Sequence, residues 1–421
     1  MYKMSKDKQN YEVYKGLLSG DQVHTLNSET VLECVQEKAL ADLGNSDRVF
    51  VLHDPCEIRK PNSQEMEYIG KVLSLEKKVV NGYHTFNSVA VDPTRTNVQL
   101  LCHETYSTGM DRYISQSELA NPQTLDISKQ TLITNGTYVN TNILYKKHIS
   151  TSSQLLKQEQ ANRVICHISD REFDDEDSFN YIHSLGDEFI TRVKLSRVSN
   201  EEIPLLTPKL GKPSKKKAHV KLVDHKFPNR AAYAIDQLSI KGKHYGQVTC
   251  ELQWGPIRLK KHTYNAVKIS LKHEGKNIFQ QPMILITNRP IGNQEHAKEV
   301  YRAYILRFKI EIVFRFLKQE LGWESFQVRD FNSIKNLLAI AFYLVGYFKE
   351  IEEVLKEHPL TKFLCQLARS KGKITLFFIL EGLRNLIQYQ EVKKWKEENN
   401  ISDDQIQEMI EYAKSNYTEV Y

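Results

Sequence analysis

Four polar residues recur along one apolar segment, YILRFKIEIVFRFLK, and their types could bind metal ions or phosphates. At 100° per residue, Tyr304, Arg307, Glu311 and Lys318 share one helical stripe about 60° wide. The remainder of the segment is mostly Leu, Ile, Val and Phe. A carboxylate and two cations on such a helix cost several kcal/mol unless they meet charged partners. We therefore expect this stripe to form part of an active site.

Two further acids each follow a short apolar strand. Asp54 comes after VFVLH, and Asp170 comes after VICHIS. A single acid in such a place is more often a turn former or a helix cap than a ligand. Together with Glu311, however, the two could form a carboxylate triad that binds Mg²⁺ or Mn²⁺. Two such ions about 3.5–4 Å apart would activate water and stabilise the leaving oxygen in a phosphoryl displacement.

Basic residues are concentrated in one part of the chain. Residues 201–280 hold sixteen Lys and Arg against six Asp and Glu, while the whole chain has a net charge of +6. The run Lys215, Lys216 and Lys217 lies in this block. Such a block predicts either an element that binds a polyanion or a solvated lysine-rich surface, and charge alone favours neither.

The segments around the acids predict a mixed α/β core. Three strands come first and suggest an antiparallel meander, and strands alternating with helices follow. This β-β-β-α-β-α-β order is typical of a mixed sheet with helices on its faces. We expect strands at 48–54, 82–93, 97–107, 161–170 and 187–196, and helices at 28–42, 153–160 and 177–186, the first capped by Ser28.

Beyond this core the pattern changes twice. Residues 199–285 alternate as strands do, which predicts a β-rich insertion, and a buried helix is expected at 334–348. The expected division is 1–47, a short helical N-terminal region; 48–198, the first part of the core; 199–285, a basic β-rich insertion domain; 286–350, the second part of the core with the polar stripe; and 351–421, a helical C-terminal region.

The composition predicts a cytoplasmic protein. The longest apolar run, 337–348, is too short to span a bilayer, and the first residues carry charges without the apolar centre of a secretory signal. The six cysteines are scattered, with no CxxC pair. The Cys–His neighbours at 102–103 and 166–167 would point to opposite faces of their strands. We expect reduced core thiols and no zinc site.

These residues together resemble those of a known family. The stripe that begins at Tyr304 reads Y-x2-R-x3-E-x6-K, and it matches without a gap the signature of bacterial DDE transposases of the insertion-sequence-four type. The D-R-E at 170–172 resembles the context of the family's second acid, and Asp54 is similar to the first. The resemblance covers roughly residues 48–350. It implies a ribonuclease-H-like α/β fold, in which a mixed sheet with flanking helices is interrupted by a β-rich insertion domain.

The resemblance also implies an enzyme that cuts DNA at the ends of a mobile element. Hydrolysis would give a free 3′-OH, which would then attack another phosphodiester. The implied partners are double-stranded DNA with terminal inverted repeats, target DNA and a second copy of the chain in a homodimer. The implied ligands of two Mg²⁺ or Mn²⁺ ions are Asp54, Asp170 and Glu311. The implied DNA contacts are Tyr304, Arg307, Lys318 and Arg171, with Lys215, Lys216 and Lys217 added from the basic block.

Two alternatives stay open beside this interpretation. One is a ribonuclease-H-like nuclease without strand transfer, and the other is a domesticated DNA-binding protein without activity. The chain also departs from the family at Met283, where some relatives have a Trp that stacks on a flipped base. Trp254 and Trp323 are the other candidates for such stacking.

Overall fold

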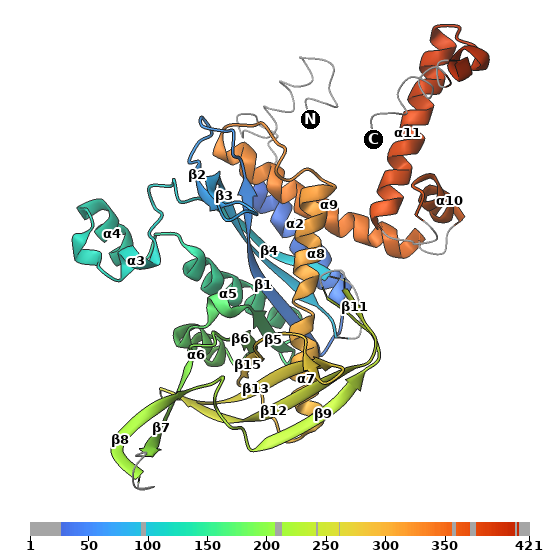
Figure 1. Cartoon of the computed structure of the whole chain (residues 1–421). Helices are drawn as coiled ribbons and strands as arrows, with labels where there is room; N and C mark the ends of the chain where they lie inside the picture. The colour runs from blue at the N-terminus through green and yellow to red at the C-terminus, as the bar shows by residue number, and fades with distance from the viewer. Residues whose placement is uncertain are drawn as a thin grey trace. The chain divides into compact units, whose positions relative to one another are not determined.

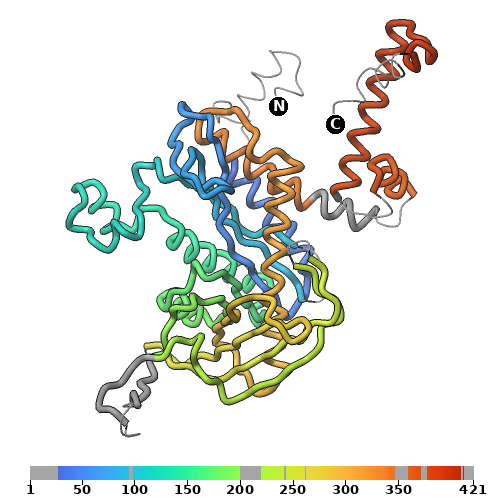
Figure 2. Tube along the Cα trace, viewed as in Figure 1, coloured from blue at the N-terminus to red at the C-terminus, as the bar shows by residue number. Residues whose placement is uncertain are grey.

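The computed structural model describes residues 27–93, 98–206, 213–240, 243–260, 262–355, 359–370, 376–408 and 411 (Figure 1 and Figure 2). The chain divides into two compact units, Met1–Gly346 and Tyr347–Tyr421. The first unit is built on a mixed sheet of eleven strands. In the described part of the second unit the regular elements are helices.

The central sheet has the order β2-β3-β1-β5-β6-β15-β13-β12-β9, with β4 also on β3 and β14 on β13. β3 is antiparallel to both β1 and β4, whereas β1, β5 and β6 run parallel. The predicted meander and mixed sheet are therefore confirmed, with the short β2 added. The strands are β1 (Arg48–Arg59), β2 (Gly70–Leu73), β3 (Val79–Val91), β4 (Val98–Tyr106), β5 (Val164–Ser169), β6 (Glu188–Arg192), β9 (Asn229–Ile235), β12 (Val248–Leu259), β13 (His262–His273), β14 (Lys276–Asn277) and β15 (Met283–Thr287).

The insertion is rich in strands, as predicted, and most of it continues the central sheet. β13 pairs with β15, β12 with β13, and β9 with β12, all antiparallel. Two small sheets lie beside it: β7 (Val198–Leu206) with β8 (Pro213–Lys221), and β10 (Leu238–Ile240) with β11 (Lys243–Tyr245). The insertion therefore extends the sheet that carries the acids.

Helices cover the sheet of the first unit (Figure 1). α2 contacts β4, α5 contacts β3 and β4, and α6 contacts β6. α7 contacts β6, β13 and β15, and α8 contacts β1. The helices in the described residues of this unit are α2 (Ser28–Leu43), α3 (Gln116–Leu119), η1 (Pro122–Thr124), α4 (Ile127–Asn135), α5 (Thr141–Glu159), η2 (Arg171–Phe173), α6 (Glu176–Ser184), α7 (Gln294–Ile305), α8 (Phe308–Gln319) and α9 (Phe331–Leu355), whose last turns belong to the second unit.

The cap expected at Ser28 was placed one residue late. Asn27 caps α2 instead, because its side chain accepts a hydrogen bond from the backbone N–H of Glu29. Ser28 is the first helical residue, and its own N–H donates to the side chain of Asn336 at 2.7 Å.

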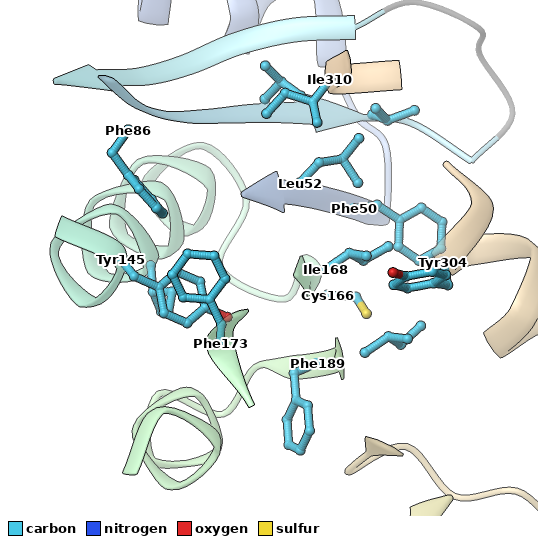
Figure 3. Packing of buried hydrophobic residues seen from close by; sticks show 14 of the residues in the cluster. Phe50, Leu52, Phe86, Tyr145, Cys166, Ile168, Phe173, Phe189, Tyr304 and Ile310 are labelled. Atoms are coloured by element: carbon cyan, nitrogen blue, oxygen red, sulfur yellow. The ribbon is translucent and has the colours of Figure 1, made fainter. Parts of the chain in front are cut away.

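The alternation of β1 assigns its residues to two sides of the sheet. Val49 and Val51 pack with residues of α2 and α5 in one cluster. Phe50 and Leu52 belong to the larger core cluster, where Figure 3 shows Phe50 beside Tyr304 of α7. Since successive side chains of a strand point to opposite faces, Asp54 lies on the α7–α8 side with Phe50 and Leu52.

The second unit contains α10 (Pro359–Leu367) and α11 (Leu376–Glu398), which pack through Leu364, Cys365 and Ile379. In the described ranges, no helix combines the length and the apolar character needed to cross a membrane. Five of the six cysteines are buried thiols, as predicted, but Cys34 is exposed, so the expectation of a core thiol was wrong there.

Candidate active site

Asp54 and Asp170 lie where the parallel pairing of β1 with β5 ends. The ladder between β1 and β5 ends at the pair Leu52 and Ile168, and each acid follows two residues later. Because the carboxyl ends of parallel strands meet at one edge, both acids reach the same crevice. They line one cavity of about 590 Å³.

The two acids are held in different ways. The sequence predicted that β1 ends at Asp54, but the strand continues to Arg59, because β3 stays paired with it as far as Gly82. Asp54 therefore lies within a continuous strand, opposite Asn87. Asp170 follows the end of β5, as predicted, and its Oδ1 accepts the backbone N–H of Arg171 at 2.7 Å.

The polar stripe is divided between two helices, which corrects the expectation of one. α7 ends at Ile305 and α8 begins at Phe308. The backbone bonds across the junction run from each N–H to the carbonyl three residues earlier, as in a 3₁₀ turn, for example from Arg307 to Tyr304 at 3.0 Å. Arg307 lies in this junction, and Glu311 lies in the first turn of α8.

Arg307 connects the two acids that come from different elements. Its Nη1 donates to Asp54 Oδ2 at 3.3 Å, and its Nη2 donates to Glu311 Oε1 at 2.5 Å. Arg307 is buried, with 6% of its surface exposed, whereas the Glu311 side chain is 48% exposed. One guanidinium thus lies between a partly buried carboxylate and a half-exposed one, and its single charge offsets only one of the two.

The other two stripe residues also contact the strand edge. Tyr304 is buried, and its hydroxyl donates to Asp170 Oδ1 at 3.2 Å. Lys318 Nζ donates to the carbonyl of Glu57 at 2.6 Å and pairs with Glu324 Oε1 at 3.2 Å. The polar groups of the stripe therefore have partners within the protein, in addition to any metal ion or phosphate.

The site is electrostatically strained around Asp54. Burial raises the pKa of Asp54 to about 7, although Arg307 acts in the opposite direction. The nearby carboxylates of Glu311, Asp170 and Glu172 raise this pKa further. A carboxylate crowded by three others is ionised at neutral pH only in part, and a bound cation would relieve the repulsion.

Three cations on the cavity wall complement these acids. Arg171 was predicted from the D-R-E motif, and it is exposed at the start of η2. Arg192 and Lys194 were missed by the sequence analysis. The Nη1 of Arg192 lies 4.0 Å from Asp170 Oδ1. The alternation of Arg192 and Lys194 in the sequence TRVK, where β6 ends, is the signal that could have identified them, since residues two apart in an extended segment share a face.

The remaining predicted contacts lie elsewhere. Lys215, Lys216 and Lys217 belong to β8, which pairs with β7 and is outside the central sheet, so their role as DNA contacts stays a prediction. Trp254 and Trp323 are buried, with 6% and 1% of their surfaces exposed, and neither offers a free face for base stacking.

The acids suit a hard divalent cation in donor type, because all three offer carboxylate oxygens and two of them line one cavity. Within the described ranges, no three Asp, Glu, His or Cys side chains gather closely enough to hold a metal ion. Arg307 lies between Asp54 and Glu311 instead. The carboxylates therefore have the donor atoms that a divalent metal requires, but the Arg307 guanidinium supplies the positive charge between Asp54 and Glu311 in this structure.

The fold and the site together define a class. Three antiparallel strands followed by two parallel ones, with acids where the parallel pair ends, are the arrangement of ribonuclease-H-like enzymes that act on nucleic acids. The family described as "Transposase DDE domain" matches residues 149–345, and this match supports a DDE transposase domain in that part of the chain. This range contains Asp170 and the whole polar stripe but begins after Asp54. No curated protein matches the chain.

Proposed function

We propose that this protein cuts the ends of a mobile DNA element and joins them to target DNA, as a transposase of the insertion-sequence-four type. The observation that carries the proposal is the crevice where the pairing of β1 with β5 ends. Asp54, Asp170 and Glu172 line one cavity there together with three cations, and Arg307 connects Glu311 to Asp54. DNA is the substrate class of the family.

Asp54, Asp170 and Glu311 would hold two divalent ions, Mg²⁺ or Mn²⁺. DDE transposases use divalent metals, and such ions lower the pKa of bound water and stabilise charge on phosphate oxygens. The chain's own residues would place the phosphodiester. Arg171, Arg192 and Lys194, which line the same cavity as the acids, offer charge-assisted hydrogen bonds to phosphate oxygens.

Tyr304 and Lys318 have positioning roles in this proposal. The Tyr304 hydroxyl, whose pKa burial raises to about 12, stays protonated and orients the Asp170 carboxylate by donating to it. Lys318 holds α8, and therefore Glu311, against β1. Direct phosphate contacts by these side chains would require them to leave these partners.

The chemistry proposed is two displacements at phosphorus. Water attacks the phosphodiester at the element's end, and the bond to the 3′ oxygen breaks, which leaves a 3′-OH and a 5′-phosphate. That 3′-OH then attacks a target phosphodiester and displaces its 3′ oxygen. The proposed partners are DNA with terminal inverted repeats, target DNA and a second copy of the chain that pairs two ends.

The test uses the purified full chain, Mg²⁺ and a duplex that carries the inverted repeats flanking its gene. Asp54→Asn, Asp170→Asn and Glu311→Gln should each lower cleavage by more than about 100-fold, because even outer partners of metal sites are worth 10–100-fold. Asp236→Asn, an exposed acid after β9, is the matched control and should cleave normally. Normal cleavage by Glu311→Gln would refute the site.

The same reaction separates the two alternatives. A nuclease without strand transfer would give cut ends but no joined products with a supercoiled target plasmid. A domesticated DNA-binding protein would retard the duplex in a gel and leave it uncut. Asp54 and Asp170 line the crevice and Arg307 links Glu311 to Asp54, and this retention of all three acids argues against the second alternative.

A further inference from the structure

A role as a DNA contact alone does not explain the position of Arg307, which is buried between two carboxylates. Its two terminal nitrogens are engaged by Asp54 and Glu311, and its Nε has no hydrogen-bond partner in the structure. Only 6% of the residue is exposed. A phosphate that approached from the crevice would meet a guanidinium whose forked face is already turned toward carboxylates.

The position of this guanidinium also bears on the acids. They do not converge on a common point, and the link between Asp54 and Glu311 is the cation itself. An arginine and a divalent metal cannot occupy the same space between two carboxylates. Metal binding at these acids therefore requires that Arg307 move away from at least one of them.

The backbone at Arg307 permits such a movement more easily than a helix interior would. The residue lies at the 3₁₀-like junction of α7 and α8, and its side chain does not cap α8. Glu311, its partner one turn later, is half exposed and can turn toward solvent. Arg307 is therefore held by a partly buried carboxylate at Asp54 and by a half-exposed carboxylate at Glu311.

We propose that Arg307 is an internal countercation that keeps the metal-binding carboxylates of the unbound protein occupied until a DNA phosphate draws it away. DNA and divalent metal then bind with positive coupling, each favouring the other. The proposal rests on the proposed function, because it takes Asp54 and Glu311 as metal ligands. It adds an order to that function: the acids become available when the substrate strand is in place.

Linkage gives the proposal a measurable form. If phosphate binding removes a competitor of the metal, metal binding must tighten DNA binding by the same factor. A phosphate can attract the guanidinium from two carboxylates because it accepts the same bidentate hydrogen bonds and carries its charge on oxygens in matching geometry. Couplings of this kind are commonly 5–150-fold.

The experiment measures Mn²⁺ binding without catalysis, by the electron paramagnetic resonance signal of free Mn²⁺. The wild-type chain is titrated alone and with a 20-base-pair duplex at low temperature. We expect the duplex to tighten Mn²⁺ binding about tenfold or more. Arg307→Gln should bind Mn²⁺ about tenfold more tightly than wild type without DNA, and the duplex should add less than about threefold.

Arg192→Gln is the matched control, since it also removes one positive charge near the acids. Arg192 Nη1 lies 4.0 Å from Asp170 and does not bridge two carboxylates. We expect its Mn²⁺ affinity without DNA to rise less than about threefold, as general screening predicts. An equal rise in both variants would overturn the proposal, because the effect would then be net charge alone.

Other outcomes are also decisive. Arg307→Gln that is folded by circular dichroism but binds Mn²⁺ no more tightly than wild type overturns the proposal, and so does a wild-type affinity that DNA leaves unchanged. If Arg307→Gln does not fold, Arg307→Lys serves instead. A single ammonium cannot bridge both acids as the fork does, so this variant should tighten Mn²⁺ binding about threefold or more, and no tightening refutes the proposal.

Failure of this proposal differs from failure of the proposed function. Asp54→Asn should lose Mn²⁺ binding and DNA cleavage together if the acids are the metal site. If that holds while Arg307→Gln behaves as wild type in Mn²⁺ binding, the function stands and the countercation role falls. If Asp54→Asn binds Mn²⁺ normally, the metal site itself, and with it this proposal, is wrong.

Discussion

Two buried histidines, His53 on β1 and His148 on α5, predict how the stability of the fold changes as the pH falls. The Nδ1 atoms of His53 and His148 lie 2.7 and 2.9 Å from the hydroxyl of Ser88. The two histidines are 0% and 3% exposed. Burial holds the pKa of both well below its ordinary value of 6.5, so both are neutral in the folded protein.

The sign of the effect follows from proton counting. The unfolded chain binds a proton at each histidine below pH 6.5 and the folded chain does not, so stability is complete above pH 6.5 and is lost as the pH falls. From pH 6.5 to 5 the loss is about 2 kcal/mol for each histidine. Asp54 acts in the opposite direction, since its pKa is raised to about 7 and the folded state takes up its proton first.

The variant His148→Gln isolates one histidine, because the contribution of Asp54 cancels when it is compared with wild type. We compare the free energy of unfolding of the variant with that of wild type at each pH. The difference, variant minus wild type, should be about 2 kcal/mol more positive at pH 5 than at pH 7. Urea unfolding with EDTA gives these values. In a Trp395→Phe background, the fluorescence of the buried Trp254 and Trp323 reports the first unit alone. Parallel pH curves for variant and parent would refute the reasoning.

Three further predictions concern the site and its frame. Tyr304→Phe should slow DNA cleavage about tenfold and lower the free energy of unfolding by only about 1 kcal/mol in urea, because it removes one hydrogen bond; unchanged cleavage would contradict the positioning role. Lys318→Met should lower the free energy of unfolding by about 1–3 kcal/mol, since its Nζ donates to a β1 carbonyl, and an unchanged thermal midpoint would count against this. Gly82→Ala should destabilise by more than about 2 kcal/mol, because its Cβ would lie 2.3 Å from the Ile58 carbonyl oxygen, whereas Gly246→Ala, with nothing within 4 Å, should unfold as wild type does.

Local patterns in the sequence were sufficient for much of the fold. The strand expected at 161–170 contains β5 (Val164–Ser169). The helix expected at 177–186 contains most of α6 (Glu176–Ser184), and Gly186 follows the helix end with a φ of +74°. These features depend on residues near one another in the chain, whose preferences act before any tertiary contact forms.

Features that depend on distant partners were missed. β1 continues past Asp54 because β3 pairs with it, and no local pattern marks that extension. The pairing of β13 with β15, by which the insertion continues the central sheet, was also not predicted. Pairing across long sequence separations is decided by the register of whole strands, which a single segment does not contain.

The sequence by itself determined which residues carry charge on an otherwise apolar helix, and therefore that Tyr304, Arg307, Glu311 and Lys318 need partners. Only the tertiary structure decided who those partners are. The parallel register of β1 and β5 brings Asp54 and Asp170 to one edge, and the packing of α7 and α8 brings Arg307 between the acids. The physical reason is that a charge specifies a need for compensation within a few ångströms, whereas the fold specifies which group lies at that distance.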